Sequence, residues 1–197
     1  LDYARPAPVE LAPLDLNEAV ETALGLVASQ KEFERITWIR HFDPAAPEAV
    51  ADKQLLEQIL INLLINAAQA TAGSGTIRVT TGAAPARECR AGDVHVGRTF
   101  GGDEGVIAVT IADRGPGIPA ENLEQIFEPF FTTKESDHGS GLGLAICHRL
   151  IEALDGTLVV ESRVGSGTTV RVLLPVAGAP GAPVPPPASA AEVGRRG

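Results

Sequence analysis

The stretch HGSGLGLAI, residues 138–146, places three glycines at alternate positions and continues directly into an apolar helical pattern. Glycine adopts backbone angles that other residues resist, and it lets a ligand come close to the main chain. A glycine loop that opens a helix is also an anion site, because free backbone amides and the helix dipole favour negative charge there. Taken alone, the stretch is equally compatible with a flexible turn.

Two common phosphate-binding motifs do not fit this stretch. A dinucleotide fingerprint needs G-x-G-x-x-G between a strand and a helix, but the sixth position counted from Gly139 is Leu144 and the preceding residues are polar. A Walker loop needs a Gly-Lys pair, and the chain contains none. The glycine loop must therefore be interpreted together with the other motifs of the chain.

The composition is that of an acidic globular protein. The chain has 197 residues, 44% of them hydrophobic, and a formal net charge of −9. This length allows one core-bearing domain. An acidic surface repels nucleic acid, whose binding rests on Lys and Arg, so we expect no nucleic-acid partner. The two cysteines, Cys89 and Cys147, do not make a disulfide framework, and we expect Cys147 to be a small buried side chain.

The cysteine content and the length of the apolar runs indicate the cellular compartment. Few cysteines favour a reducing compartment, and no apolar run approaches the length of a membrane span. We therefore expect a cytoplasmic location. Because no signal peptide is visible and the chain contains no methionine, we interpret it as a fragment, and a membrane anchor elsewhere in the parent protein stays open.

The chain divides into a linker, a folded domain and a tail. Residues 1–14 contain three prolines and are predicted to be a linker. Residues 177–197 are rich in Pro, Ala and Gly, which predicts a disordered tail. Between them, residues 15–176 run helix, strands, helix, strands, helix, strands. This order predicts an α+β fold, a two-layer sandwich of a mixed, mostly antiparallel sheet with helices on one face. Residues 83–104, rich in Gly and Arg, are predicted to be a mobile hairpin insertion.

Capping residues mark the predicted helix starts. Asp15 followed by Glu18 is typical of a helix N-terminus, and Asp52 precedes a broad apolar helical face. A third helix is predicted from Gly141 to about Leu154. Strands are predicted at 35–42, 75–82, 105–113, 157–163 and 167–175, with 48–51 as a short candidate partner for 35–42.

Three further motifs accompany the glycine loop. DRGPGI, residues 113–118, sets an aspartate at the end of an apolar strand, followed by two glycines. IFEPFFTTK, residues 126–134, holds three phenylalanines in five positions. Asn62 and Asn66 are four apart on one helix and therefore lie on one face. Together these motifs resemble the catalytic ATP-binding domain of sensor histidine kinases, in the superfamily shared with gyrase, mismatch-repair ATPases and heat-shock chaperones. The resemblance implies their Bergerat-type sandwich and covers about 52–175.

The resemblance implies a role for each motif. Asn66 ligates Mg²⁺ through its amide oxygen, which suits a hard cation, and Asn62 lies beside the phosphates of ATP. Asp113 accepts a hydrogen bond from the adenine amino group, Gly117 lets the backbone pass close to the base, and Thr168 buttresses the aspartate. The other residues implied in nucleotide binding are Gly115, Ile118, Phe127, Lys134, Gly139, Ser140, Gly141, Leu142, Gly143 and Leu144.

The segment 118–140 becomes a mobile lid over the nucleotide in this interpretation. Lys134 is the best lid cation for a phosphate and, with Asn62, the candidate catalytic residue, although a solvated surface charge is the alternative for Lys134. The three phenylalanines of 126–134 either belong to the core or anchor the lid on it. His138 adjoins the glycine loop and is expected to be a bystander.

The pattern departs from the superfamily in ways that bear on chemistry. Its hydrolases carry a glutamate as general base where this chain has Asn62, and an amide cannot take a proton from water. In the kinases the nucleophile is a histidine on a dimerisation domain, and no histidine of this chain is followed by Glu. Gln69 stands where some related kinases have a phosphate-contacting Lys or Arg.

We therefore expect a catalytic domain that transfers the γ-phosphoryl group of ATP to a histidine on a separate dimerisation domain. The expected partners are that domain and the receiver domain of a response regulator, in a homodimeric parent protein. The alternatives are a degenerate nucleotide-binding module that regulates a partner and, less well supported because of Asn62, a stand-alone ATPase.

Overall fold

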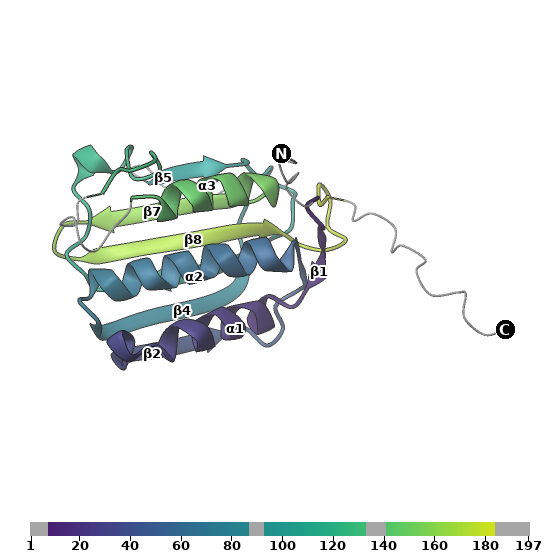
Figure 1. Ribbon diagram of the computed structural model, residues 1–197. Helices are drawn as coiled ribbons and strands as arrows, with labels where there is room; N and C mark the ends of the chain where they lie inside the picture. The colour runs from purple at the N-terminus through teal and green to yellow at the C-terminus, as the bar shows by residue number, and fades with distance from the viewer. Residues whose placement is uncertain (1–7, 87–92, 133–140, 184–197) are drawn as a thin grey trace, which may run out of the picture.

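The computed structural model describes residues 8–86, 93–132 and 141–183, in which three helices cover one face of a six-stranded sheet (Figure 1). The helices are α1 (Leu16–Ala28), α2 (Lys53–Ala70) and α3 (Gly143–Ala153). Two short 3₁₀ turns are η1 (Lys31–Phe33) and η2 (Ala120–Asn122). The arrangement confirms the predicted α+β class with helices on one face. Within the described ranges, no helix has both the length and the apolar character needed to cross a membrane.

The sheet is mixed, with strand order β2-β4-β6-β8-β7-β5. β2 pairs parallel with β4, and the other neighbours are antiparallel. In this order the strands are β2 (Arg35–Phe42), β4 (Ser74–Ala84), β6 (Val106–Ala112), β8 (Gly167–Pro175), β7 (Thr157–Arg163) and β5 (Val94–Gly97). Ala112 lies opposite Thr169, so the end of β6 and the start of β8 lie side by side. This register brings together two residues of the site described below.

Both predicted aspartate caps are present. The Asp15 carboxylate accepts hydrogen bonds from the backbone N–H groups of Asn17 and Glu18 at 2.8 and 3.2 Å. The Asp52 carboxylate accepts from those of Gln54 and Leu55 at 3.0 and 3.2 Å. Each aspartate satisfies N–H groups that the first helical turn leaves without a partner. The sequence therefore predicted where α1 and α2 begin, whereas α3 begins two residues after the predicted Gly141.

The main core lies between the helices and the sheet. Its largest fully buried side chains include Leu24 on α1, Leu60 on α2, Ile77 on β4, Ile111 on β6 and Ile151 on α3. A second, smaller cluster lies on the opposite face of the sheet. It consists of Phe100, Val106, Ala108, Val159 and Leu173. The loop that follows β5 thus covers part of the face that carries no helix.

The prediction of a hairpin at 83–104 is wrong for the described part of that segment. Val94–Gly97 forms β5, which pairs with β7 rather than with a neighbouring piece of the insertion. Phe100, from the same segment, is 4% exposed. The physical reason is that β7 offers an unpaired edge and β5 covers it. Residues 87–92 lie outside the described residues.

The predicted linker and tail both contribute structure. Ala12–Leu14 forms β1, which pairs antiparallel with β3 (Ala49–Ala51) in a separate two-stranded sheet. The segment 48–51 is therefore not the partner of 35–42, and residues 12–14 are not linker. At the other end, the Ala177 N–H donates to the Glu48 carbonyl at 2.9 Å. Arg98 Nη1 donates to the Gly181 carbonyl oxygen at 3.2 Å, so the tail is hydrogen-bonded to the domain at Ala177 and Gly181. Residues 184–197 lie outside the described residues.

The two ends of the described chain lie at the same end of the sheet. Val176 forms an isolated bridge with Ala49, which places the residue after β8 beside the β1–β3 sheet. In Figure 1 this is the right-hand end, whereas α2 ends and α3 begins at the left. The chain thus enters and leaves the domain at the end opposite to the site.

Candidate functional site

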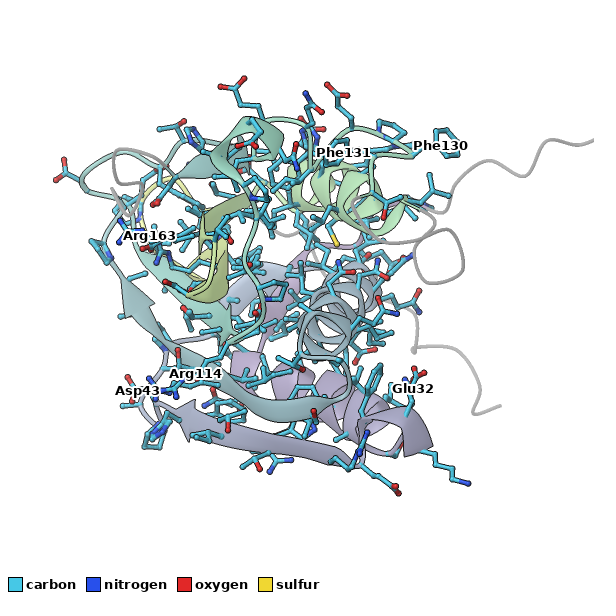
Figure 2. The ribbon with its side chains drawn as sticks, turned by 90° about the vertical axis from the view of Figure 1, so that its left-hand side faces the viewer. Glu32, Asp43, Arg114, Phe130, Phe131 and Arg163 are labelled. Atoms are coloured by element: carbon cyan, nitrogen blue, oxygen red, sulfur yellow. The ribbon has the colours of Figure 1, made fainter. Side chains whose placement is uncertain are left out.

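A cavity of about 880 Å³ opens where α2 ends and α3 begins. Figure 2 views the molecule from this end. Ile111, Val160 and Val170, from three neighbouring strands, give the cavity an apolar wall. The volume lies in the range of roughly 300–1,000 Å³ that is typical of small-molecule sites. The cavity is lined by nine of the predicted site residues: Asn62, Asn66, Asp113, Gly117, Ile118, Gly141, Gly143, Leu144 and Thr168.

Asp113 is a buried carboxylate held in one orientation. Its side chain follows β6 and is 8% exposed. One carboxylate oxygen, Oδ1, accepts hydrogen bonds from the backbone N–H groups of Gly115 at 2.7 Å and Thr168 at 3.3 Å. Burial raises the pKa of this carboxyl group, although the two backbone hydrogen bonds oppose the shift. A fixed, poorly hydrated acceptor of this kind favours a ligand that brings its own hydrogen-bond donor.

Thr168 contacts the aspartate through its backbone rather than its hydroxyl group. Its carbonyl oxygen accepts a hydrogen bond from the Asp113 N–H at 2.9 Å. The hydroxyl lies 2.8 Å from that of Ser162, and the Ser162 hydroxyl accepts from the Ile118 N–H at 2.8 Å. Ser162 therefore joins β7 and β8 to the segment that begins at Ile118. Sequence reasoning missed Ser162, because a serine in an alternating strand carries no distinguishing signal.

Two glycines of the DRGPGI motif are required by packing. Gly117 has a φ of +74°, and a Cβ there would collide with the carbonyl oxygen of Arg163. A Cβ on Gly115 would lie 2.9 Å from the carbonyl oxygen of Ala70. The loop after β6 is thus wedged between the end of β7 and the end of α2. Close packing against protein, which the sequence did not predict, explains both glycines.

The asparagines of α2 face the start of α3. A Cβ placed on Gly143 would lie 3.6 Å from Asn66 Nδ2 and 3.9 Å from Oδ1. The N-cap residue of α3 is Leu142, whose own side chain makes no capping hydrogen bond. The backbone amides of a first helical turn carry partial positive charge. The Asn66 amide and the N-terminus of α3 therefore line the same part of the cavity.

Cys147 lies behind Asn62 between α2 and α3. It is fully buried, as predicted, and its Sγ lies 3.9 Å from the carbonyl oxygen of Ile59. Burial raises the pKa of its thiol to about 12, although a hydrogen bond with the Asn62 side chain lowers it. The thiol therefore stays protonated at neutral pH, and it packs as part of the wall that holds Asn62.

The three phenylalanines have different environments. Phe127 is 7% exposed and packs edge-to-face on His148, with ring centroids 5.9 Å apart. Phe131 lines the cavity. Phe130 is 75% exposed, has a φ of +69°, and points away from the protein body in Figure 2. The expectation that all three belong to the core or anchor the segment on it is therefore wrong for Phe130.

Some predicted site residues do not line the cavity, and several unpredicted ones do. Gly115, Phe127 and Leu142 lie outside its lining, and Lys134, Gly139, Ser140 and His138 lie outside the described residues. The unpredicted lining residues include Glu32, Phe33, Ala72, Gly73, Ile126 and Thr132. The first two come from η1, far from any motif in the sequence, so no local signal pointed to them.

The one-sided sandwich and a cavity that pairs a buried carboxylate with a helix N-terminus define an ATPase-type nucleotide-binding domain. The chain belongs to the family of histidine kinase-, DNA gyrase B-, and HSP90-like ATPases, which matches residues 51–178.

Several named proteins are similar to this chain. It is 35% identical over 176 residues to the signal transduction histidine-protein kinase AtoS of Escherichia coli strain K12, covering 89% of this chain and 26% of AtoS. It is 35% identical over 180 residues to the sensory histidine kinase/phosphatase NtrB of Rhodobacter capsulatus, covering 89% of this chain and 46% of NtrB. The chain thus spans less than half the length of either relative.

Solved structures show the same relationship. The catalytic domain of histidine kinase ThkA superposes with a TM-score of 0.65 at 30% identity, covering 85% of this chain and 96% of that one. Full-length ShkA in complex with AMPPNP superposes with a TM-score of 0.67 at 27% identity, covering 89% of this chain and 33% of ShkA.

Proposed function

We propose that this chain is the ATP-binding catalytic domain of a two-component sensor histidine kinase. In this role it transfers the γ-phosphoryl group of ATP to a histidine on a separate dimerisation domain, for relay to the receiver domain of a response regulator. The observation that carries the proposal is the presence of Asp113, Asn66 and the N-terminus of α3 in one cavity. Asp113 can accept a hydrogen bond from the base of ATP, and Asn66 and the N-terminus of α3 can bind its phosphates.

Asp113 is proposed to recognise adenine. Its carboxylate accepts a hydrogen bond from the exocyclic amino group, while the backbone amides of Gly115 and Thr168 hold the side chain in place. The apolar wall of Ile111, Val160 and Val170 packs against the flat faces of the base. Guanine has a carbonyl where adenine has the amino group, and two acceptors facing each other are unfavourable.

The start of α3 is proposed to bind the phosphates. Its amide groups supply partial positive charge, and the adjacent Asn66 offers a neutral amide oxygen. Mg²⁺ prefers oxygen ligands and is usually held by few protein groups together with substrate phosphates, so this donor fits that ion. When bound, Mg²⁺ supplies charge that offsets the phosphate oxygens. Gly139, Ser140 and Lys134 keep their proposed places beside the phosphates.

Asn62 supports transfer rather than hydrolysis. An amide has no basic site with which to take a proton from water, so a water molecule beside the γ-phosphate stays a poor nucleophile. The acceptor is then a histidine brought by another domain. We propose that this domain belongs to the same parent protein, that the parent is a homodimer, and that the catalytic domain works in the cytoplasm.

The test combines this chain with the dimerisation domain of its parent protein and γ-labelled radioactive ATP. We expect acid-labile, base-stable label on the dimerisation domain and none on this chain alone. Asp113→Ala should abolish the label because ATP no longer binds. Tight ATP binding without any label on the added domain would contradict the kinase proposal and leave a regulatory nucleotide-binding module.

A further inference from the structure

The cavity extends past the proposed adenine site. Beyond Asp113 its lining continues to Glu32 and Phe33 of η1 and to Ala72 and Gly73 in the turn after α2. The proposed contacts with ATP leave this end of the cavity unused.

The lining is continuous between the aspartate and η1. A Cβ on Gly115 would lie 2.9 Å from both Asp113 Oδ1 and the carbonyl oxygen of Ala70, so the carboxylate lies beside the last turn of α2. Three residues after Ala70, the last residue of α2, a Cβ on Gly73 would lie 2.6 Å from the carbonyl oxygen of Glu32. The turn after α2 therefore rests directly on η1, and Asp113, this turn and η1 all line the same cavity.

The chemistry of this end differs from that of the phosphate end. Ala70 and Ala72, which line this end, have small side chains, whereas Gly73 is packed against the Glu32 carbonyl oxygen. Phe33 is 3% exposed and gives an apolar wall. Glu32 is exposed and is one of the residues that line the cavity. In Figure 2 Glu32 lies at the lower right and Phe131 near the top, and both line the cavity.

We propose that this end of the cavity is a second subsite, which takes a flexible substituent on the adenine amino group with a positively charged end. The inference rests on the proposed function, because Asp113 fixes the position of that amino group. The amino group has two hydrogens, so a substituent replaces one while Asp113 accepts the other. The apolar part of the substituent lies along Ala72 and Phe33, and its ammonium group meets Glu32.

The test is competition against a fluorescent ATP analogue by three nucleotides. They are ATP itself, ATP with a hexyl chain on its adenine amino group, and ATP with an aminohexyl chain at the same atom. We expect both alkylated nucleotides to compete about as well as ATP, and the aminohexyl form to bind about two- to fivefold more tightly than the hexyl form. This advantage is what an exposed ion pair typically contributes.

Two variants and one matched control test which residues contact the substituent on the adenine amino group. Glu32→Gln should remove the advantage of the aminohexyl over the hexyl nucleotide, whereas Glu34→Gln, two residues away and outside the cavity lining, should keep it. Ala72→Leu should weaken both alkylated nucleotides relative to ATP by filling this end of the cavity. An equal loss of the advantage in both glutamine variants would overturn the assignment to Glu32.

The competition also separates this inference from the proposed function. If ATP competes and neither alkylated nucleotide does, the cavity ends at the adenine and the subsite is refuted, while ATP binding stands. If none of the three competes, ATP included, the proposed function fails and the subsite fails with it.

Discussion

Replacement of Asp113 by asparagine should change which base the cavity prefers. The structure fixes the orientation of the new amide, because the position of Oδ1 faces the backbone N–H groups of Gly115 and Thr168. The amide oxygen must occupy that position, since an NH₂ group there would face two donors. The NH₂ group then takes the place of Oδ2. The variant therefore offers a donor where the wild type offers an acceptor.

The size of the effect follows from the type of hydrogen bond. Hydrogen bonds to charged groups contribute about 1.5–3 kcal/mol, which corresponds to about 10- to 100-fold in affinity. We expect Asp113→Asn to weaken ATP binding by this factor. GTP should bind the wild type poorly and the variant better, because its carbonyl now meets a donor. The preference for ATP over GTP should therefore shrink or reverse.

The assay is competition of ATP and GTP against a fluorescent ATP analogue, with thermal unfolding of both proteins as the folding control. Equal discrimination between ATP and GTP in wild type and variant would refute the reasoning. In that case Asp113 does not contact the base, and the adenine lies elsewhere in the cavity.

Four further expectations follow from the same geometry. Asn66→Ala should remove the Mg²⁺ dependence of ATP affinity, which calorimetric titration with and without the ion measures. The purified chain should release almost no phosphate from ATP, because Asn62 is not a base; robust release that disappears in Asp113→Ala would contradict this. Asp113→Asn should raise the melting temperature at neutral pH. The raised pKa of the folded carboxyl means that its ionised form costs stability, so the gain should vanish as pH falls below the unfolded pKa, and melting curves across pH test the sign. Gly117→Ala should destabilise far more than Gly165→Ala by urea unfolding. Both glycines have φ near +75°, at +74° and +76°, but only the first has a backbone oxygen where the new Cβ must go, so the control should lose only about 1–2 kcal/mol.

Local signals in the sequence predicted much of this fold. Asp15 and Asp52 were identified as helix caps because a cap acts on amides two and three residues away. The longer strands were identified by their alternation. The cavity residues Asn62, Asn66 and Asp113 were found because the set of motifs resembles the ATP-binding domain of sensor histidine kinases, and that resemblance implied a shared site.

What the sequence missed depends on contacts between distant segments. β1 and β5 are short, and their partners β3 and β7 lie about 40 and 60 residues further along the chain, so nothing local indicates the pairing. Phe100 covers the sheet from a segment that resembles an ordinary polar loop. Glu32 and Phe33 reach the cavity only because the turn after α2 packs on η1. Gly117 was correctly identified as a position that requires glycine. The structure explains the requirement by close packing against the Arg163 carbonyl, whereas the sequence suggested close approach to the base.

The two ends of the described chain, near residues 8 and 183, lie at the β1–β3 end of the domain, and this has a mechanical consequence. A force that pulls on the two ends acts first on the three-residue pairing of Ala12–Leu14 with Ala49–Ala51 and on the single bridge from Ala49 to Val176. These few contacts lie at the end of the domain opposite to the cavity (Figure 1). Tension is therefore carried first at a distance from the cavity, before it passes into α1 and β8.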